Sequence, residues 1–256
     1  MNPLFVGVNA NDPKDLILFL LETIHKELNN PEITNGNNNN NQFIDNRNFN
    51  DIFKEFSQNY ISQNKSIISD EFYGFSNSMT TCELCHTIIH NVQAFNIIFF
   101  PLEEIRIFKN NNYNNVNIYD CFDYYEKQDS YPSFYCNYCK QNCQAVQQTK
   151  LLNPPKNIII NLNRGKGIQF KVNIVFEEYL NIIKYIYSKD IFYYELTGVI
   201  CHFGSNDMGG HFIAFCKNSD NCQWYKYNDQ TVTKSSFIEV KESGLPYVLF
   251  YSYIQV

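Results

Sequence analysis

The chain of 256 residues has neither an excess of positive charge nor long apolar runs, and each absence excludes a class of function. It has 20 Lys and Arg against 26 Asp and Glu, a formal net charge of −6. Nucleic-acid binding needs a basic face, so we expect no nucleic-acid partner and favour a basic protein partner instead. No apolar run approaches the roughly 20 residues of a membrane helix, and Asn, Pro and Gly interrupt residues 1–10, unlike a signal peptide. We therefore expect a protein of the cytoplasm, the nucleus or both, without membrane contact.

The composition predicts a folded domain with one local exception. Aromatic residues make up 16% of the chain and charged residues 18%, which favours a globular protein with an ample core. Residues 35–42 consist of Asn with one Gly and one Gln. Such a tract cannot bury a core, so we interpret it as a disordered linker or insertion.

Two segments have the apolar spacing of helices. Residues 11–29 begin with Asp12 as an N-cap and Pro13 at the first helical position, and apolar residues recur at helical intervals after them. Residues 49–60 repeat this spacing, which indicates a face packed on the core.

Strands are indicated further along the chain. Residues 158–162 are β-branched and apolar after a proline stop, which predicts a buried strand. Residues 95–100 form another apolar run, which ends at Pro101 and Leu102. Gly165 and Gly167 flank one Lys, an arrangement with too few glycines for a phosphate loop, so we expect a hairpin turn there.

Nine cysteines are present, and four of them form two Cys-x-x-Cys pairs with 50 residues between the inner cysteines. In a reducing compartment such pairs indicate metal ligands rather than disulfides. Two pairs can supply four thiolates to a tetrahedral structural zinc ion and clamp two hairpins that have little core of their own. The predicted ligands are Cys82, Cys85, Cys136 and Cys139. Cys143, His86 and His90 are close enough in sequence to be rival ligands.

A histidine near the end of the chain is placed for chemistry. Two apolar, strand-like runs within residues 196–216 flank a polar turn, and His211 follows Gly209 and Gly210 directly after it. A catalytic imidazole needs a neighbour that fixes its tautomer and ring plane. Asn228 and Asp229, at the end of the next predicted strand, can take that place. The alternative is a surface turn histidine, with Trp224 serving only as a core anchor.

The segments 194–204, 209–217, 224–229 and 247–251 together resemble the histidine box of the ubiquitin-specific proteases. These are papain-like cysteine peptidases that hydrolyse the bond after the C-terminal glycine of ubiquitin. The resemblance implies that His211 is the general base, that Asn228 orients it, and that Asp229 is an acid able to share or replace that role. It also places Gly209 and Gly210 among the substrate-binding residues. An Asn is sufficient as the third member because a thiolate–imidazolium pair carries its own charge.

The first predicted helix resembles the family segment in which a Gln-Asp-Ala-x-Glu-Phe motif opens a helix. Asp12 then matches the motif's Asp and Asp15 its Glu, and the resemblance places both near the channel that receives the basic tail of ubiquitin. The alternative is that both acids only complement the positive end of the helix. The two roles are compatible.

The resemblance implies an α+β fold of the thumb–palm–fingers type, present in part. Residues 1–66 would be thumb helices, residues 67–150 the fingers with a zinc ribbon, and residues 151–256 an antiparallel β palm with the histidine box. Residues 95–100 resemble the strand that leaves the zinc knuckle in the family's fingers. Similarity to the family runs from Asp12 to Tyr251 in the family's order.

One family element is absent, the box that carries the nucleophilic cysteine before the first helix. Residues 1–11 contain no Cys, and none of Cys121, Cys143, Cys201, Cys216 or Cys222 has that sequence context. Alternation along the strands predicts that Cys201 and Cys216 are small core residues.

We therefore expect a monomeric part of a deubiquitinase that binds ubiquitin or ubiquitinated protein but is inactive by itself. Two alternatives remain open. One is a non-catalytic ubiquitin-binding module, and the other is a zinc-stabilised scaffold without ubiquitin contact.

Overall fold

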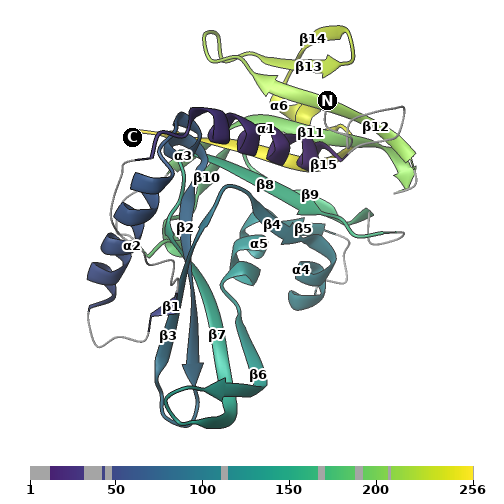
Figure 1. Cartoon of the computed structure of the whole chain (residues 1–256). Coiled ribbons are helices and arrows are strands. Elements are labelled where there is room, and N and C mark those ends of the chain that lie inside the picture. The colour runs from purple at the N-terminus through teal and green to yellow at the C-terminus, as the bar shows by residue number, and fades with distance from the viewer. Residues whose placement is uncertain are drawn as a thin grey trace.

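The computed structural model describes residues 12–31, 42–43, 48–110, 115–166, 171–187, 193–206 and 209–255. An eight-stranded palm sheet lies beside the N-terminal helices, and a five-stranded finger sheet extends away from it (Figure 1). The predicted α+β fold is confirmed. Of the Asn-rich tract only Gln42 belongs to the described residues, where it begins β1 (Gln42–Phe43).

Helix α1 (Pro13–Leu28) begins as its sequence predicts. The Asp12 carboxylate accepts a hydrogen bond from the backbone N–H of Lys14 at 2.8 Å, and Pro13 occupies the first turn. One face packs on the palm sheet, where Leu21 joins a cluster with Ile159 and Val248. A second stripe on the same helix is 38% to 52% exposed; it consists of Leu16, Leu20, Ile24 and Leu28. Helix α1 therefore has two apolar faces, and only one of them is buried.

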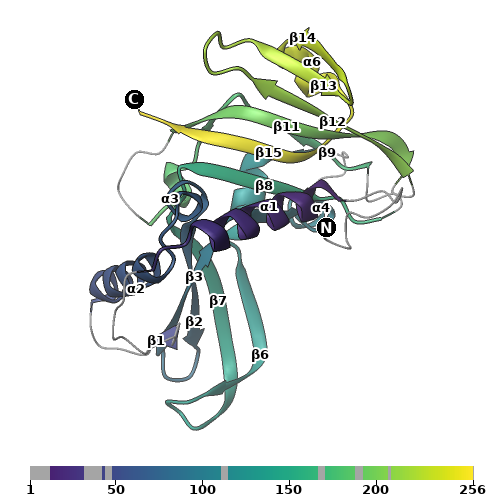
Figure 2. The same ribbon diagram turned by 45° about the horizontal axis from the view of Figure 1, so that its top comes forward.

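Helices α2 (Phe49–Gln63) and α3 (Ile67–Phe72) connect α1 to the fingers (Figure 2). The predicted helix at 49–60 is confirmed and extends by three residues. Phe53, Phe56 and Tyr60 of α2 pack around Phe75 at the root of the fingers. Ser66 caps α3 and lies 2.7 Å from Nδ1 of the buried His25, which ties α3 to α1.

The finger sheet has the strand order β1-β3-β2-β7-β6, and all of its pairings are antiparallel. Its long strands are β2 (Gly74–Cys82), β3 (Ile88–Phe95), β6 (Gln128–Cys136) and β7 (Gln141–Asn153). They form two hairpins, β2–β3 and β6–β7, that meet along the β2–β7 pairing. The small core at their root comprises Phe75, Val92 and Leu152. The far ends of both hairpins carry the Cys-x-x-Cys pairs.

The palm sheet has the order β14-β13-β12-β11-β15-β8-β4, and β10 pairs with β11 at the side. The strands are β4 (Ile98–Pro101), β8 (Asn157–Asn163), β10 (Tyr179–Asn181), β11 (Tyr193–Asn206), β12 (Gly209–Lys217), β13 (Trp224–Asn228), β14 (Thr231–Ser235) and β15 (Leu245–Ile254). Only the β4–β8 pairing is parallel among these strands.

Both faces of the palm sheet are covered, and the pattern in β8 shows why. Ile158 and Ile160 face the main core, whereas Ile159 faces the cluster under α1 and α3. A strand buried on both sides is a continuous apolar run rather than an alternating one. The main core also holds α4 (Leu102–Phe108), α5 (Ile118–Tyr125), the pair β5 (Asn115–Asn117) and β9 (Asn173–Val175), η3 (Ile183–Tyr185) and α6 (Phe237–Glu242).

Two local expectations are wrong, and a third lies partly outside the described residues. The run 95–100 is not one strand, because β3 ends at Phe95 in the finger sheet and β4 begins at Ile98 in the palm sheet. Gly167 of the expected hairpin turn lies outside the described residues, and the preceding strand β8 pairs with β15 and β4. Cys216 is exposed rather than a core residue, although Cys201 is fully buried as expected.

Candidate functional site

The hairpin β11–β12 positions His211. Phe203 on β11 is the Cα partner of His211 on β12, and a register shift follows between Phe203 and Asn206. Residues 207–208 at the tip of this hairpin lie outside the described residues. The pairing holds the backbone of His211 on the sheet while its ring remains 45% exposed.

The strand beyond β12 supplies the partner of this histidine. Asn228, the last residue of β13, places Oδ1 2.6 Å from Nε2 of His211. A carbonyl oxygen can only accept, so Nε2 carries the proton and Nδ1 is the nitrogen left to accept one. Asp229 lies 3.7 Å from the same nitrogen and is 78% exposed, in the left-handed conformation of the β13–β14 turn with φ 51°. Asn228 is therefore the closer of the two orienting residues that the sequence indicated.

The two predicted substrate-binding glycines differ in what surrounds them. A Cβ on Gly209 would meet nothing within 4 Å, whereas a Cβ on Gly210 would collide with the imidazole of His202 and with the carbonyl oxygen of Phe203. The fold itself therefore requires glycine at 210. His202 is buried beneath this turn, 5.0 Å from the ring of Phe212, and sequence reasoning did not identify it.

Burial lowers the pKa of His202, and the nearby Arg164 guanidinium lowers it further. Arg164 is itself buried and donates to the carbonyl oxygen of Pro246 at 2.8 Å. A neutral His202 is consistent with its packing against Gly210, because a charged imidazole in this position would lack water and face a second cation.

Asp12 is linked to the region around His211 through Tyr247 of β15. The hydroxyl of Tyr247 on β15 donates to Oδ2 of Asp12 at 2.8 Å, and its ring lies 5.3 Å from that of Phe212. Burial raises the pKa of Tyr247, so this hydroxyl remains a donor at neutral pH. Asp15 is about half exposed and pairs with Lys14 at 3.2 Å. Asp12 thus caps helix α1 and also contacts the region around His211. Nothing in the sequence indicated that Tyr247 makes this contact.

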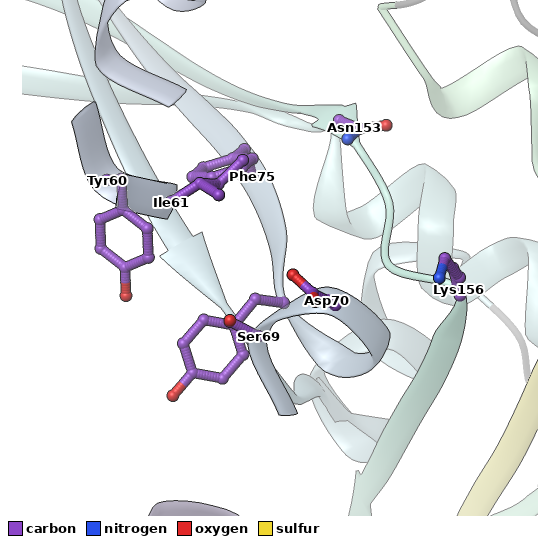
Figure 3. Close-up of a pocket in the computed structure, with 8 residues that line it drawn as sticks. Tyr60, Ile61, Ser69, Asp70, Phe75, Asn153 and Lys156 are labelled. Carbon is purple, nitrogen blue, oxygen red and sulfur yellow. The ribbon is translucent and has the colours of Figure 1, made fainter. Parts of the chain in front are cut away.

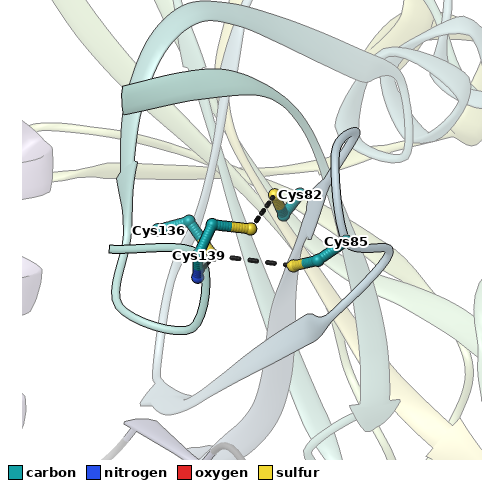
Figure 4. A group of neighbouring side chains, drawn as sticks. All are labelled: Cys82, Cys85, Cys136 and Cys139. Carbon is teal, nitrogen blue, oxygen red and sulfur yellow. Dashed lines mark hydrogen bonds between the residues drawn. The ribbon is translucent and has the colours of Figure 1, made fainter. Parts of the chain in front are cut away.

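The four predicted metal ligands converge at the tips of the two finger hairpins (Figure 4). Their sulfur atoms all lie within 4.8 Å of one another, with 3.8 Å between Cys82 and Cys139 and 3.7 Å between Cys85 and Cys136. Sulfurs at about 2.3 Å from a tetrahedral zinc are about 3.75 Å apart, so this group of four, Cys82, Cys85, Cys136 and Cys139, can bind a structural zinc ion.

Both Cys-x-x-Cys pairs have the same local geometry. The residue after each pair, His86 or Lys140, has a left-handed φ of 58° or 59°. Each donates its backbone N–H to the carbonyl of the first cysteine, at 2.9 Å and 2.8 Å. Both pairs therefore end in the same kind of turn, and the side chain of His86 is exposed and is not one of the four grouped residues.

The other two rival ligands, His90 and Cys143, also lie outside the group of four. Nδ1 of His90 lies 2.9 Å from Nδ2 of Asn77, and its ring stacks on Phe49 with 4.4 Å between ring centroids. Cys143 Sγ lies 3.2 Å from Cys82 Sγ but outside the group of four.

The negative charge that the four cysteines carry as thiolates favours the binding of a metal cation. The backbone N–H of Cys85 lowers the pKa of the Cys82 thiol to about 6. Hydrogen bonding with Cys85 raises the pKa of Cys139. Four thiolates so close together repel one another, and a divalent metal ion removes that repulsion.

All nine cysteines are described, and His211 is hydrogen-bonded to Asn228 rather than to any of them. Cys121 and Cys201 are buried in the palm core, where burial raises the pKa of Cys201 to about 12. Cys216 is exposed and lies five residues after His211 on β12. At the usual rise per residue of a β-strand, this places it about 16 Å from His211. Cys222 is exposed in the turn after β12.

A pocket of about 310 Å³ lies between α2, α3 and β2, with Phe75, Tyr60 and Tyr73 among its walls (Figure 3). Its lining residues belong neither to the His211 hairpin nor to the four-cysteine group.

Among the described helices, none is long and apolar enough to cross a membrane.

The family model for ubiquitin carboxyl-terminal hydrolase matches residues 1–251. Ubiquitin carboxyl-terminal hydrolase 2 of Homo sapiens is 25% identical over 257 residues, which covers 97% of this chain. Ubiquitin carboxyl-terminal hydrolase 48 of Rattus norvegicus is 34% identical over 106 residues, covering 37% of this chain and 10% of the relative.

Solved structures show the same fold. A chain of the yeast SAGA DUBm structure matches with a TM-score of 0.71 and 24% identity over 96% of this chain. A chain of the SAGA Ubp8/Sgf11/Sus1/Sgf73 module bound to monoubiquitin matches with a TM-score of 0.64 and 26% identity over 81% of it.

The chain spans only part of these proteins, 41% of the human relative and 51% and 48% of the two matched structural chains. The match to the family model nevertheless covers almost all of its own residues. The chain belongs to the ubiquitin carboxyl-terminal hydrolase family.

Proposed function

We propose that this chain supplies the palm, the fingers and part of the thumb of a thiol-dependent deubiquitinase. The observation that carries this proposal is the 2.6 Å hydrogen bond between His211 and Asn228 on an exposed hairpin. In the complete site a thiolate attacks the carbonyl carbon of the ubiquitin C-terminal glycine. His211 takes the thiol proton on Nδ1 and gives it to the leaving amine, and water then hydrolyses the thioester.

Asn228 serves as the orienting residue. It accepts from Nε2, which leaves Nδ1 facing the reaction, and Asp229 adds a negative charge to the protonated ring. The nucleophilic thiol is not among the nine cysteines, so it would be supplied from outside these 256 residues. Without it the chain has no covalent route, because nucleophile and base act as a unit.

Ubiquitin is the proposed substrate. Related structures are described as SAGA Ubp8 modules bound to monoubiquitin and to ubiquitin aldehyde. Asp12, Asp15 and Gly209 are proposed to contact its basic tail. Gly210 has no side chain, so it leaves room for the tail beside the hairpin. Asp12 has the best support, since Tyr247 links it to the ring beside His211.

The monomer expectation has no support among the comparisons, because the related Ubp8 belongs to a module of several subunits. The exposed stripe of α1, which begins at Leu16 and ends at Leu28, is consistent with a further covering segment or subunit. We propose action in the nucleus, the cytoplasm or both.

A second candidate function is a non-catalytic ubiquitin-binding module. The observation that favours it is that His211 is hydrogen-bonded to Asn228 and to none of the nine cysteines, all of which are described. Both candidates require ubiquitin binding, and they differ in whether a thiol is ever delivered to His211.

The four-cysteine group predicts about one zinc ion per purified chain. Cys82→Ser with Cys136→Ser should remove the metal and lower the midpoint of thermal unfolding by at least about 5 °C, because metal binding is coupled to folding of the fingers. Metal analysis and calorimetry measure both effects. The control is Cys216→Ser with Cys222→Ser, which changes two exposed cysteines and should keep the metal; freshly purified protein without zinc would contradict the assignment.

The ubiquitin-channel proposal predicts a salt-dependent loss of affinity when Asp12 and Asp15 are both replaced by Asn. The Asn side chain keeps the helix-cap acceptor but removes the charge, so ubiquitin binding should weaken about tenfold at low ionic strength and less at high salt. Isothermal titration at two salt concentrations measures this difference. Asp51→Asn, in the first turn of α2, is the matched control; equal affinity of the double variant and the parent would show that both acids are only helix caps.

Incubation with a ubiquitin C-terminal electrophile should label none of the nine cysteines specifically. The sulfurs of Cys201 and Cys216 are, respectively, buried and remote from His211, so neither can attack a tail bound beside it. Mass spectrometry of the adducts provides the measurement. Labelling that disappears in Cys201→Ser or Cys216→Ser would show that the nucleophile is in this chain after all.

A further inference from the structure

We propose that Cys143 is an oxidation site through which peroxide disables the zinc centre of the fingers. Cys143 is oxidised first, and Cys82 then leaves the metal to form a disulfide with it. The inference rests on the zinc site described above and is independent of the reaction at His211.

Geometry places a fifth sulfur against the four-cysteine group. Cys143 lies on β7 opposite Phe134 of β6, and Cys82 ends the neighbouring strand β2 opposite Ala145. Their sulfurs are 3.2 Å apart, closer than the 3.7 Å and 3.8 Å separations within the group. A disulfide needs about 2.05 Å, so the two sulfurs must approach by only about 1.2 Å.

This spacing does not fit Cys143 as a fifth metal ligand. If zinc were about 2.3 Å from both sulfurs, a 3.2 Å separation would force the angle at the metal to about 90°, away from the tetrahedral value. The Cys82–Cys139 and Cys85–Cys136 separations match the tetrahedral value instead. Cys143 is therefore a neighbour of the ligand Cys82 rather than a ligand itself.

Exposure decides which sulfur reacts first. Cys82 is fully buried, whereas Cys143 is half-buried, so an oxidant from solvent reaches Cys143. The Cys143 thiol donates to the carbonyl oxygen of Phe134 at 3.5 Å. Its sulfur attacks hydrogen peroxide, the O–O bond breaks, and the thiol proton joins the leaving hydroxide as water, which leaves a sulfenic acid. The Cys82 thiolate then attacks the sulfenic sulfur, the S–S bond forms, and hydroxide leaves. One proton from solvent converts this hydroxide to water, so one peroxide oxidises one thiol and one thiolate.

The disulfide leaves zinc with three protein ligands: Cys85, Cys136 and Cys139. Metal affinity in such sites is coupled to folding of the segment that carries the ligands. The tips of both finger hairpins have few buried apolar residues, and the small finger core lies at their root. Loss of one thiolate should therefore release zinc to a chelator and loosen the finger tips, and a thiol reductant with added zinc should restore them.

The test uses the full chain loaded with zinc, titrated with hydrogen peroxide in the presence of a zinc-sensitive dye. The parent should release its zinc as a Cys82–Cys143 disulfide appears in non-reducing peptide maps. Cys143→Ser and Cys143→Ala, each shown to hold zinc before oxidation, should need at least tenfold more peroxide. Cys216→Ser, which removes an exposed thiol elsewhere, should behave as the parent.

Two results would overturn the proposal while the metal site stands. One is zinc release from both Cys143 variants at the parent's peroxide concentration. The other is a disulfide that maps to Cys85 and Cys136 instead. A chain that binds no zinc before oxidation would overturn the metal assignment and this proposal together, and it would leave the role of His211 untouched.

Discussion

The ladder from β11 through β12 to β13 is the constraint on which the rest of the site depends. It brings His211 and Asn228, seventeen residues apart, to a hydrogen bond of 2.6 Å. A slip of one residue in either pairing would turn the imidazole to the opposite face of the sheet. His202 and Gly210 fix the hairpin from below, since only glycine fits against the buried ring. The surrounding palm core, buried on both faces, holds this ladder rigid.

The fingers depend on a different interaction. Their strands are long, but the buried cluster at their root is small, and the four cysteines join the two hairpins at the far end. Metal binding can supply there what apolar burial supplies in the palm. This division makes the fingers sensitive to chelation and oxidation, while the palm should keep the geometry of His211.

Local signals in the sequence predicted much of this structure. The cap and proline before α1, the spacing of α2 and the apolar run of β8 each act within a few residues, and all three were confirmed. The Cys-x-x-Cys spacing and the glycines before His211 likewise indicated sites directly. Long-range packing was not predictable. The run 95–100 is divided between two sheets, Cys216 faces solvent, and Tyr247 reaches Asp12 from the other end of the chain, because tertiary contacts rather than local spacing determine these positions.

We propose that the ubiquitin tail is delivered to His211. Photocrosslinking of this chain with ubiquitin that carries a diazirine at its C-terminal residue, followed by peptide mapping, measures where the tail lies. We expect adducts in residues 209–212 and at Tyr247 or Asn228, and loss of these adducts with ubiquitin that lacks its last residues. Adducts confined to the finger tips or to the pocket between α2 and α3, or equal yields with truncated ubiquitin, would contradict it.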